Sequence, residues 1–480
     1  MSSVDIAIIT VYLIAVICVG AFFFRGQRSL NDFFLGHQNI PWWAAAFSGI
    51  ATVLSAVSFL GAPGQAFKSD LRFLQYRLGA PFALFLIGWI MIPFFYRLQV
   101  FSIYEYLESR FDLKTRLLAS GQFFLLKALF LGIAIYAPSL LFVQMTGLPL
   151  MPVVMAVGLF TTFYTAMGGV KAVIWTDTLQ LLILFGGLGT AAAVIARRAG
   201  GAARVLQIAS ESGKLTFLDF SMDFSSEFTL LGGVIGGTFV LMSQYGVNQA
   251  ELQKMLTTAN VNKSRLALIS SMLTATAVGF AYFLIGAGLW VFYSQHADKG
   301  GMITPPDRVF AKFILEELPP GIKGILMAAV AAAAMSAVSS VLNALTTVIT
   351  TDFYSRLRNQ PASITSARWI TVAIGVACTL SALYVDRLGN ILVASTKLQN
   401  FFGGSVTGVF LLGMTTHRAT GQGAFIGLIA GTGSVILLSL FTSISWMWHG
   451  AFAAAVAYGA GYVLSLRPED KPIGHLVWRP

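Results

Sequence analysis

Hydroxyl-bearing residues recur along one apolar, alanine-rich stretch of this sequence. In MAAVAAAAMSAVSSVLNALTTVITTDF, Ser336, Ser340, Asn343 and Thr347 share one face of a helix, and Ser339 lies beside them. A hard cation such as sodium takes about five or six oxygen ligands, and neutral hydroxyls and carbonyls supply them without a buried carboxylate. Ser339, Ser340 and the carbonyl of Ser336 are therefore candidate sodium ligands. The alternative is a packing face of small residues.

Two other apolar segments contain residues that interrupt helices. WWAAAFSGIATVLSAVSFLGAPG and LLGGVIGGTFVLMSQYGVNQ both carry Gly, Ser or Pro at several points. A helix that breaks inside a bilayer exposes carbonyl and amide groups, which an ion, a polar substrate or cavity water must satisfy. A pair of interrupted helices is typical of a transporter's central site. We expect the carbonyls of Ala51 and Leu54 to complete the sodium shell, with close helix packing as the alternative.

A carboxylate lies in the interior of one apolar segment. Asp177, in VIWTDTLQ, is an acidic residue in the interior of a predicted span, whereas Asp5 lies at the very start of one. An intramembrane carboxylate is a candidate functional group, so Asp177 and Asn343 form a possible second cation site. The alternative is an interfacial carboxylate that pairs with a basic neighbour or caps a helix.

Arg77, Lys127 and Lys397 are basic residues within the apolar segments. Unpaired cations in a membrane are costly and favour an anionic ligand. Lys127 lies about eleven residues into its span, so it could pair with a substrate carboxylate or instead reach polar backbone or the interface. Arg77 and Arg97 are about 30 Å apart along one helix and could instead extend to opposite interfaces.

The second interrupted segment adds hydrogen-bonding and aromatic side chains suited to a small carboxylate. For Asn248, capping of a helix is the alternative. The candidate substrate-binding residues are Ser55, Ser58, Arg77, Lys127, Ser243, Gln244, Tyr245, Asn248 and Gln399.

The composition of the chain indicates that these candidate residues lie in a membrane protein. The chain has 480 residues, of which 56% are hydrophobic and 11% charged, whereas soluble domains carry about 25% charged residues. The two cysteines, Cys18 and Cys378, suggest no disulfide framework, and the five histidines have no metal-ligand spacing. No nucleophile elbow, phosphate-binding loop or catalytic acid pair is present, so we expect no enzyme. The net charge of +11 is assigned to membrane topology and not to nucleic-acid binding.

The apolar segments predict about thirteen membrane-spanning helices. They run near 4–24, 41–66, 73–98, 116–144, 149–167, 171–196, 228–250, 264–292, 322–351, 364–384, 390–414, 421–441 and 445–465. The distribution of Lys and Arg between the loops favours an N-terminus outside the cell membrane and a cytoplasmic C-terminus. Lys254 falls in a predicted cytoplasmic connection in this arrangement.

Four long strings resemble the sodium:solute symporter family, and most closely its monocarboxylate, multivitamin and iodide transporter branch. They are FYRLQVFSIYEYLESRF, GIAIYAPSLLFVQMTGL, FYTAMGGVKAVIWTDTLQ and YGVNQAELQ. The resemblance implies an all-α, leucine-transporter-like fold within a single transmembrane domain, 1–480. It implies an extra helix at 4–24, inverted repeats at 41–196 and 228–414, and two terminal helices at 421–465.

The same resemblance implies alternating access and a sodium site at Ala51, Leu54, Ser336, Ser339 and Ser340. Family members that look to bind two sodium ions have serines near the aspartate that corresponds to Asp177, at positions where this chain has Leu342 and Asn343. The expected function is sodium-coupled import of a small organic anion, a monocarboxylate or vitamin-like acid. The expected partners are sodium, this anion and the lipid bilayer, with no obligate protein partner. Proton coupling, or an inorganic anion or other small polar solute, is the alternative.

Overall fold

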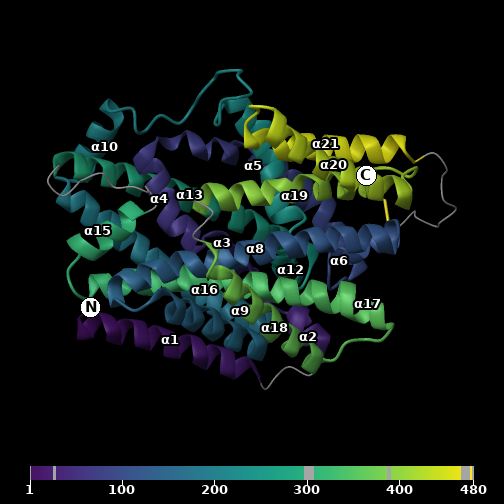
Figure 1. The fold of residues 1–480 in the computed structure, drawn as a ribbon, viewed down its shortest axis with the longest axis horizontal. Helices are drawn as coiled ribbons and strands as arrows, with labels where there is room; N and C mark the ends of the chain where they lie inside the picture. The colour runs from purple at the N-terminus through teal and green to yellow at the C-terminus, as the bar shows by residue number, and fades with distance from the viewer. Residues whose placement is uncertain (1, 25–28, 297–307, 386–390, 466–475, 478–480) are drawn as a thin grey trace.

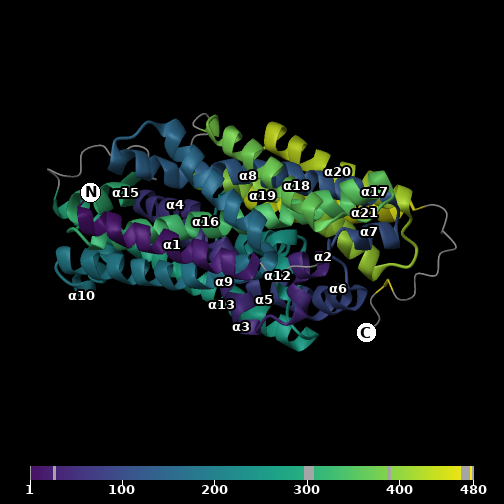
Figure 2. The same ribbon diagram turned by 90° about the horizontal axis from the view of Figure 1, so that it is seen from below.

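Long helices that run side by side make up the molecule. The computed structural model describes residues 2–24, 29–296, 308–385, 391–465 and 476–477, although side chains of 391–401 are not described. Within these residues the regular elements are helices, with no strand. The chain starts at one end of the bundle, and its last helix finishes at the other (Figures 1 and 2). The all-α prediction is confirmed.

The helices follow the expected order along the chain. They are α1 (Ser3–Phe24), α2 (Leu30–Leu35), η1 (Gly36–Gln38), α3 (Trp42–Val53), α4 (Ala56–Lys68), η2 (Leu71–Gly79), α5 (Ala80–Phe85), η3 (Leu86–Met91), α6 (Ile92–Leu98), α7 (Glu105–Arg110), α8 (Leu113–Thr146), α9 (Leu150–Arg198), α10 (Ala202–Glu211), η4 (Gly232–Gly236), α11 (Gly237–Leu241), η5 (Met242–Gly246), α12 (Gln249–Leu256), α13 (Val261–Gln295), α15 (Val309–Glu317), α16 (Ile322–Val348), η7 (Ile349–Tyr354), α17 (Ser355–Arg358), α18 (Ile364–Ala382), α19 (Ile391–Thr415), α20 (Gly421–Phe441) and α21 (Trp446–Val463).

Eight described stretches are long and apolar enough to cross a bilayer, and the bent pair α3 and α4 makes a ninth. Three further predicted spans correspond to the broken segment 232–256, to α19 and to α21. The last is accounted for by α9, which covers two predicted spans that meet at Gly169. Gly169 has a φ of 56° and a ψ of −158°, so α9 consists of two helical segments. The short helices α10 and α15 lie in connections expected to be loops.

Helix α16 lies at the centre of the bundle. Every residue from Leu326 to Val348 is buried, and the helix packs against α1, α3, α4, α8, α9 and α18. A helix that is covered on all sides needs small or apolar residues around its whole circumference, and the alanine-rich sequence provides them. The hydroxyl-bearing face of α16 therefore points into the protein interior and not towards lipid.

Glycines allow η2 to cross η4 and α11 with almost no side chain between them. A Cβ atom at Gly237 would lie 2.2 Å from the carbonyl oxygen of Tyr76, and one at Gly79 would lie 2.2 Å from the amide nitrogen of Thr238. A Cβ at Gly233 would lie 2.5 Å from the carbonyl oxygen of Gln75. This backbone-to-backbone contact fixes the position of η2, which carries Tyr76 and Arg77.

We expect Gly237→Ala to destabilise the protein by about 1–3 kcal/mol, because the added methyl group must push two backbones apart. The measurement is the thermal unfolding midpoint of the purified protein in detergent. Gly186→Ala is the matched control, because a Cβ there meets nothing within 4 Å and alanine favours a helix over glycine. Equal midpoints for the two variants would contradict the tight crossing.

Candidate functional site

The first broken helix, made of α3 and α4, borders the site. Helix α3 ends at Val53, α4 begins at Ala56, and the two are bent by 57°. Leu54 has a φ of −85° and a ψ of 59°, and Ser55 is extended. The last carbonyls of a helix have no partners within it and form the negative end of its dipole. The break at Leu54 and Ser55 therefore presents backbone oxygens that suit a cation, as the sequence predicts.

The second broken helix lies at Val247 and Asn248. The π-helical segment η5 ends at Gly246, and Asn248 begins α12 by accepting a hydrogen bond from the amide of Ala250 at 3.1 Å. Asn248 therefore caps a helix, which is the alternative expected from the sequence, and its side chain also lines the cavity described next. Single-turn π-helical segments are frequent at functional sites.

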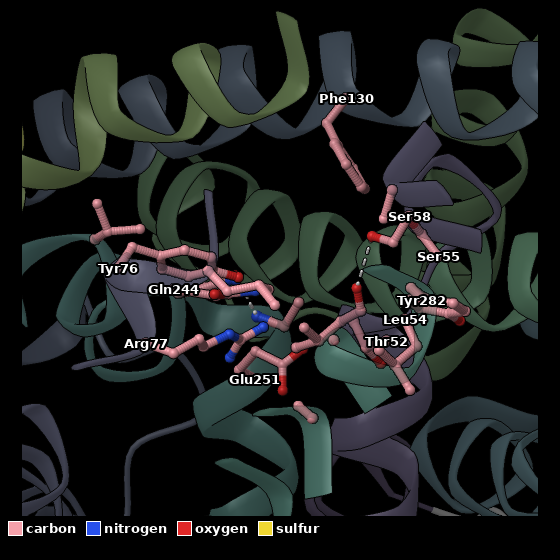
Figure 3. A pocket seen from close by; sticks show the side chains of 18 of the residues that line it. Thr52, Leu54, Ser55, Ser58, Tyr76, Arg77, Phe130, Gln244, Glu251 and Tyr282 are labelled. Atoms are coloured by element: carbon pink, nitrogen blue, oxygen red, sulfur yellow. Dashed lines mark hydrogen bonds between the residues drawn. The ribbon is translucent and has the colours of Figure 1, made fainter. Parts of the chain in front are cut away.

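Both breaks border one cavity of about 110 Å³ (Figure 3). The first contributes Thr52, Leu54 and Ser55, and the second contributes Gln244 and Glu251. Other lining side chains come from η2, α8 and α13, namely Phe73, Tyr76, Arg77, Lys127, Phe130 and Tyr282. The two interrupted segments, far apart in the sequence, thus meet at a small cavity with polar and aromatic walls.

Most of the predicted substrate-binding residues line this cavity. They are Ser55, Ser58, Arg77, Lys127, Gln244 and Asn248. Ser243 instead lines a smaller neighbouring hollow together with Lys127 and Asn248. Tyr245 is fully buried, its hydroxyl has no hydrogen-bond partner, and it does not line the cavity. Gln399 lies in α19, and its side chain is outside the described residues.

Two buried cations face the cavity. Arg77 is 8% exposed and stacks over the ring of Tyr76 at 4.7 Å, while its Nε and Nη1 atoms have no hydrogen-bond partner. Arg77 therefore does not extend to a membrane interface. Lys127 is 5% exposed, and its ammonium lies 5.4 Å from the ring centre of Phe130.

Sequence reasoning missed a carboxylate in the same cavity. Glu251, on α12, is 1% exposed, and its Oε2 atom has no hydrogen-bond partner. The sequence suggested that the span ends near residue 250, which would have put Glu251 in a cytoplasmic connection. The available signal was its place within one turn of the break at Val247. The cavity thus holds two basic groups and one acidic group among the described lining residues.

The serine face of α16 meets the end of α3. The Thr52 hydroxyl donates to Ser340 Oγ at 2.9 Å, and Ser339 donates to the carbonyl of Ser336 at 3.1 Å. Ser336 Oγ and Asn343 Oδ1 are buried without hydrogen-bond partners. Unsatisfied buried oxygens are unusual in proteins and suit a bound cation. The predicted sodium residues Ala51, Leu54, Ser336, Ser339 and Ser340 are all buried.

Asp177 is paired with a lysine that the sequence placed in the cytoplasm. Lys254 is only 2% exposed, and its ammonium lies 3.1 Å from Asp177 Oδ2. Ser48 donates to Asp177 Oδ2 at 2.5 Å and Ser340 donates to it at 3.1 Å, while Oδ1 has no partner. Lys254 thus lies in a helix, α12, whose residues are all buried, and not in an exposed connection.

Within the described residues no group of three His, Cys, Asp or Glu could hold a metal ion. The oxygens near Ser340 are mostly hydroxyls and backbone carbonyls, with Asp177 as the one carboxylate hydrogen-bonded there. Such a donor set suits an alkali cation better than a transition metal.

Known proteins resemble this chain over most of its length. A sodium/sialic acid symporter, NanT, from Aliivibrio fischeri is 29% identical, over 94% of this chain and 91% of the relative. The human sodium/iodide cotransporter is 33% identical, over 87% of this chain and 66% of the relative. A sodium-coupled monocarboxylate transporter 2 from Danio rerio is 32% identical, over 90% of this chain and 70% of the relative.

Solved structures agree with the fold. A substrate-bound, outward-open sodium-coupled sialic acid symporter matches with a TM-score of 0.90 at 29% identity, over 97% of this chain and 99% of that one. The nucleobase-cation symporter Mhp1 matches in fold alone, with a TM-score of 0.61 at 12% identity, over 91% and 94% of the two chains. The expected leucine-transporter-like fold is confirmed. The family model for sodium:solute symporters matches residues 33–431, and the chain belongs to the sodium:solute symporter family, multi-pass membrane transporters that use sodium as the coupling ion.

Proposed function

We propose that this chain imports a small organic anion together with sodium, by alternating access. The observation that carries the proposal is the charge of the cavity, where Arg77 and Lys127 face one carboxylate, Glu251, among the lining residues that the structure describes. A buried charge without a partner is strongly unfavourable, so the excess positive charge favours a ligand with one negative charge. The aromatic rings of Tyr76, Phe73 and Phe130 suit the apolar part of a monocarboxylate or vitamin-like acid.

The relatives support an anionic substrate. Their names specify iodide, monocarboxylates and sialic acid, and all three are anions near neutral pH. A neutral sugar is disfavoured for this chain because it would leave Arg77 and Lys127 with one carboxylate between them.

We place sodium between α3 and α16, at the carbonyls of Ala51 and Leu54 and at Ser336, Ser339 and Ser340. Support comes from the unpartnered Ser336 Oγ and from the hydrogen bond between Thr52 and Ser340, which brings the two helices together. A cation held by two helices stabilises one relative position of them. Sodium then changes the affinity for the anion because it binds the two conformations unequally.

The proposal includes the organisation and orientation of the chain. The repeats at 41–196 and 228–414 would each open on a broken helix, α3 with α4 in one and η4 to α12 in the other. Helix α1 starts at one end of the bundle and α21 finishes at the other (Figure 1), in agreement with an odd number of spans. The excess of Lys and Arg in the predicted cytoplasmic connections supports an external N-terminus.

Ser339→Ala should weaken sodium binding by about tenfold or more, which corresponds to about 1.4 kcal/mol. The measurement is the thermal midpoint of purified protein titrated with sodium chloride, with potassium chloride keeping the ionic strength constant. A ligand that binds the folded state raises this midpoint. Ser139→Ala is the matched control, since Ser139 is also buried and donates to a helical carbonyl, that of Ile135. If the sodium concentration that gives half of the thermal shift is the same in Ser339→Ala as in the wild type, this site assignment is wrong.

Arg77→Met and Lys127→Met should abolish sodium-dependent binding of small anions, because each removes one of the positive charges that balance the ligand. The test screens lactate, nicotinate and iodide by thermal shift with and without sodium, followed by uptake of the best ligand into proteoliposomes.

Arg97→Met is the control for this pair, because Arg97 is exposed on α6, in the same predicted span. Uptake of a neutral sugar by the wild-type protein, with no response to any anion, would overturn the proposed substrate class. Retained anion binding in both cavity variants would place the anion elsewhere.

A further inference from the structure

The ammonium group of Lys254 lies in an oxygen cage that has the composition of a cation site. It donates to the carbonyl of Ser48 at 2.8 Å and to Ser340 Oγ at 2.7 Å, and it contacts Asp177 Oδ2 at 3.1 Å. It also donates to the hydroxyl of Thr52. The four oxygens belong to α3, α9 and α16, and the lysine belongs to α12. One side chain thus joins four helices.

The cage overlaps the proposed sodium site. Ser340 is a ligand in that site, and Thr52, which also contacts Lys254, lies between Ala51 and Leu54. An ammonium and a sodium ion that shared the oxygen of Ser340 would be about 4–5 Å apart, where two like charges repel strongly in a protein interior. The single carboxylate of Asp177 balances only one of them. The two cations therefore compete for the oxygen of Ser340 and for the negative charge of Asp177.

We propose that Lys254 and sodium exclude one another: the tethered ammonium holds Ser340 and Asp177 when sodium is absent, and sodium displaces the ammonium when it binds at the adjoining site. This inference rests on the proposed sodium site and adds a competitor that the chain itself supplies. The ammonium keeps Asp177 neutralised after sodium has left, so the empty transporter can change conformation without an unpaired buried carboxylate.

A second carboxylate is available to the displaced ammonium. Glu251 lies three residues before Lys254 on α12, a spacing at which helical side chains interact. Glu251 lines the substrate cavity, its Oε2 atom has no hydrogen-bond partner, and it interacts electrostatically with both Lys254 and Lys127. When Lys254 turns from Asp177 to Glu251, it neutralises the acid of the cavity. Lys127 then no longer shares the charge of Glu251 and is free for the anion, so sodium binding increases anion affinity.

The decisive variant is Lys254→Met, which removes the competitor and leaves Asp177 in place. We expect this variant to bind sodium more tightly than the wild type does. The sodium concentration that gives half of the thermal shift should fall by about tenfold or more. A merely structural lysine would give the opposite result, because its loss would loosen the cage and weaken sodium binding. Lys263→Met is the matched control, since Lys263 is exposed in the first turn of α13 and its loss should leave this sodium concentration unchanged.

A charge-balanced pair keeps the test independent of folding defects. Asp177→Asn with Lys254→Met removes both members of the buried ion pair and leaves no uncompensated charge. This double variant should bind sodium more tightly than Asp177→Asn alone, in which the ammonium still competes. Equal or weaker binding in the double variant would overturn the proposal.

Transport supplies a second readout. The probe is whichever of labelled lactate, nicotinate or iodide binds best in the thermal-shift screen. In proteoliposomes Lys254→Met should retain exchange of this anion between the two sides, with sodium present on both, and lose most net uptake, because only net uptake needs the sodium-free return. Equal loss of both activities would contradict the proposal. If sodium stabilises the wild type no better than potassium does, the proposed sodium site itself fails. If it does stabilise the wild type but the Lys254 variants bind no more tightly, only the competition fails.

Discussion

A helix that stops inside a bilayer leaves peptide groups without hydrogen-bond partners, and lipid offers none. The rest of this structure depends on that constraint. The breaks at Leu54 and Val247 are stable only where polar groups replace water, and both border the same cavity. At the breaks themselves, the Ser58 hydroxyl donates to the carbonyl of Val53 at 3.4 Å and the Tyr104 hydroxyl donates to that of Val247 at 3.0 Å. Polar side chains therefore gather where the two helices break.

Buried charge follows from the same constraint. Asp177, Lys254, Glu251, Lys127 and Arg77 are all buried, and each would be strongly unfavourable alone. Only Asp177 and Lys254 form a direct ion pair among these groups, according to the contacts of the described residues. The other three face the cavity and carry one net positive charge. If a monovalent anion crosses with one sodium ion, no net charge moves, whereas a second sodium would use the membrane potential.

Sequence patterns predicted the features that are local in the chain. The interrupting residues near Leu54 and Val247 located both breaks, and charges within apolar stretches identified Arg77, Lys127 and Asp177 as exceptional. Lys254 and Glu251 were missed because hydropathy marks where an apolar run ends, and it does not report whether the residues that follow are buried in the protein. The contact of Lys254 with Asp177 joins residues 77 positions apart, and no local pattern reports such a pairing.

The two kinds of helix contact in the molecule suit different mechanical roles. Where η2 crosses α11, glycines bring backbone against backbone, and packed backbones have one good arrangement because any shift creates clashes or voids. We therefore expect η2 and α11 to move together as one unit. Where α3 meets α16, the contact runs through hydroxyls of Thr52 and Ser340, which can exchange one partner for another at small cost in free energy. We therefore expect conformational change that depends on ion binding to occur at the polar contact between α3 and α16. At the glycine contact between η2 and α11 the backbones keep their relative position, so Arg77 moves as part of a rigid unit.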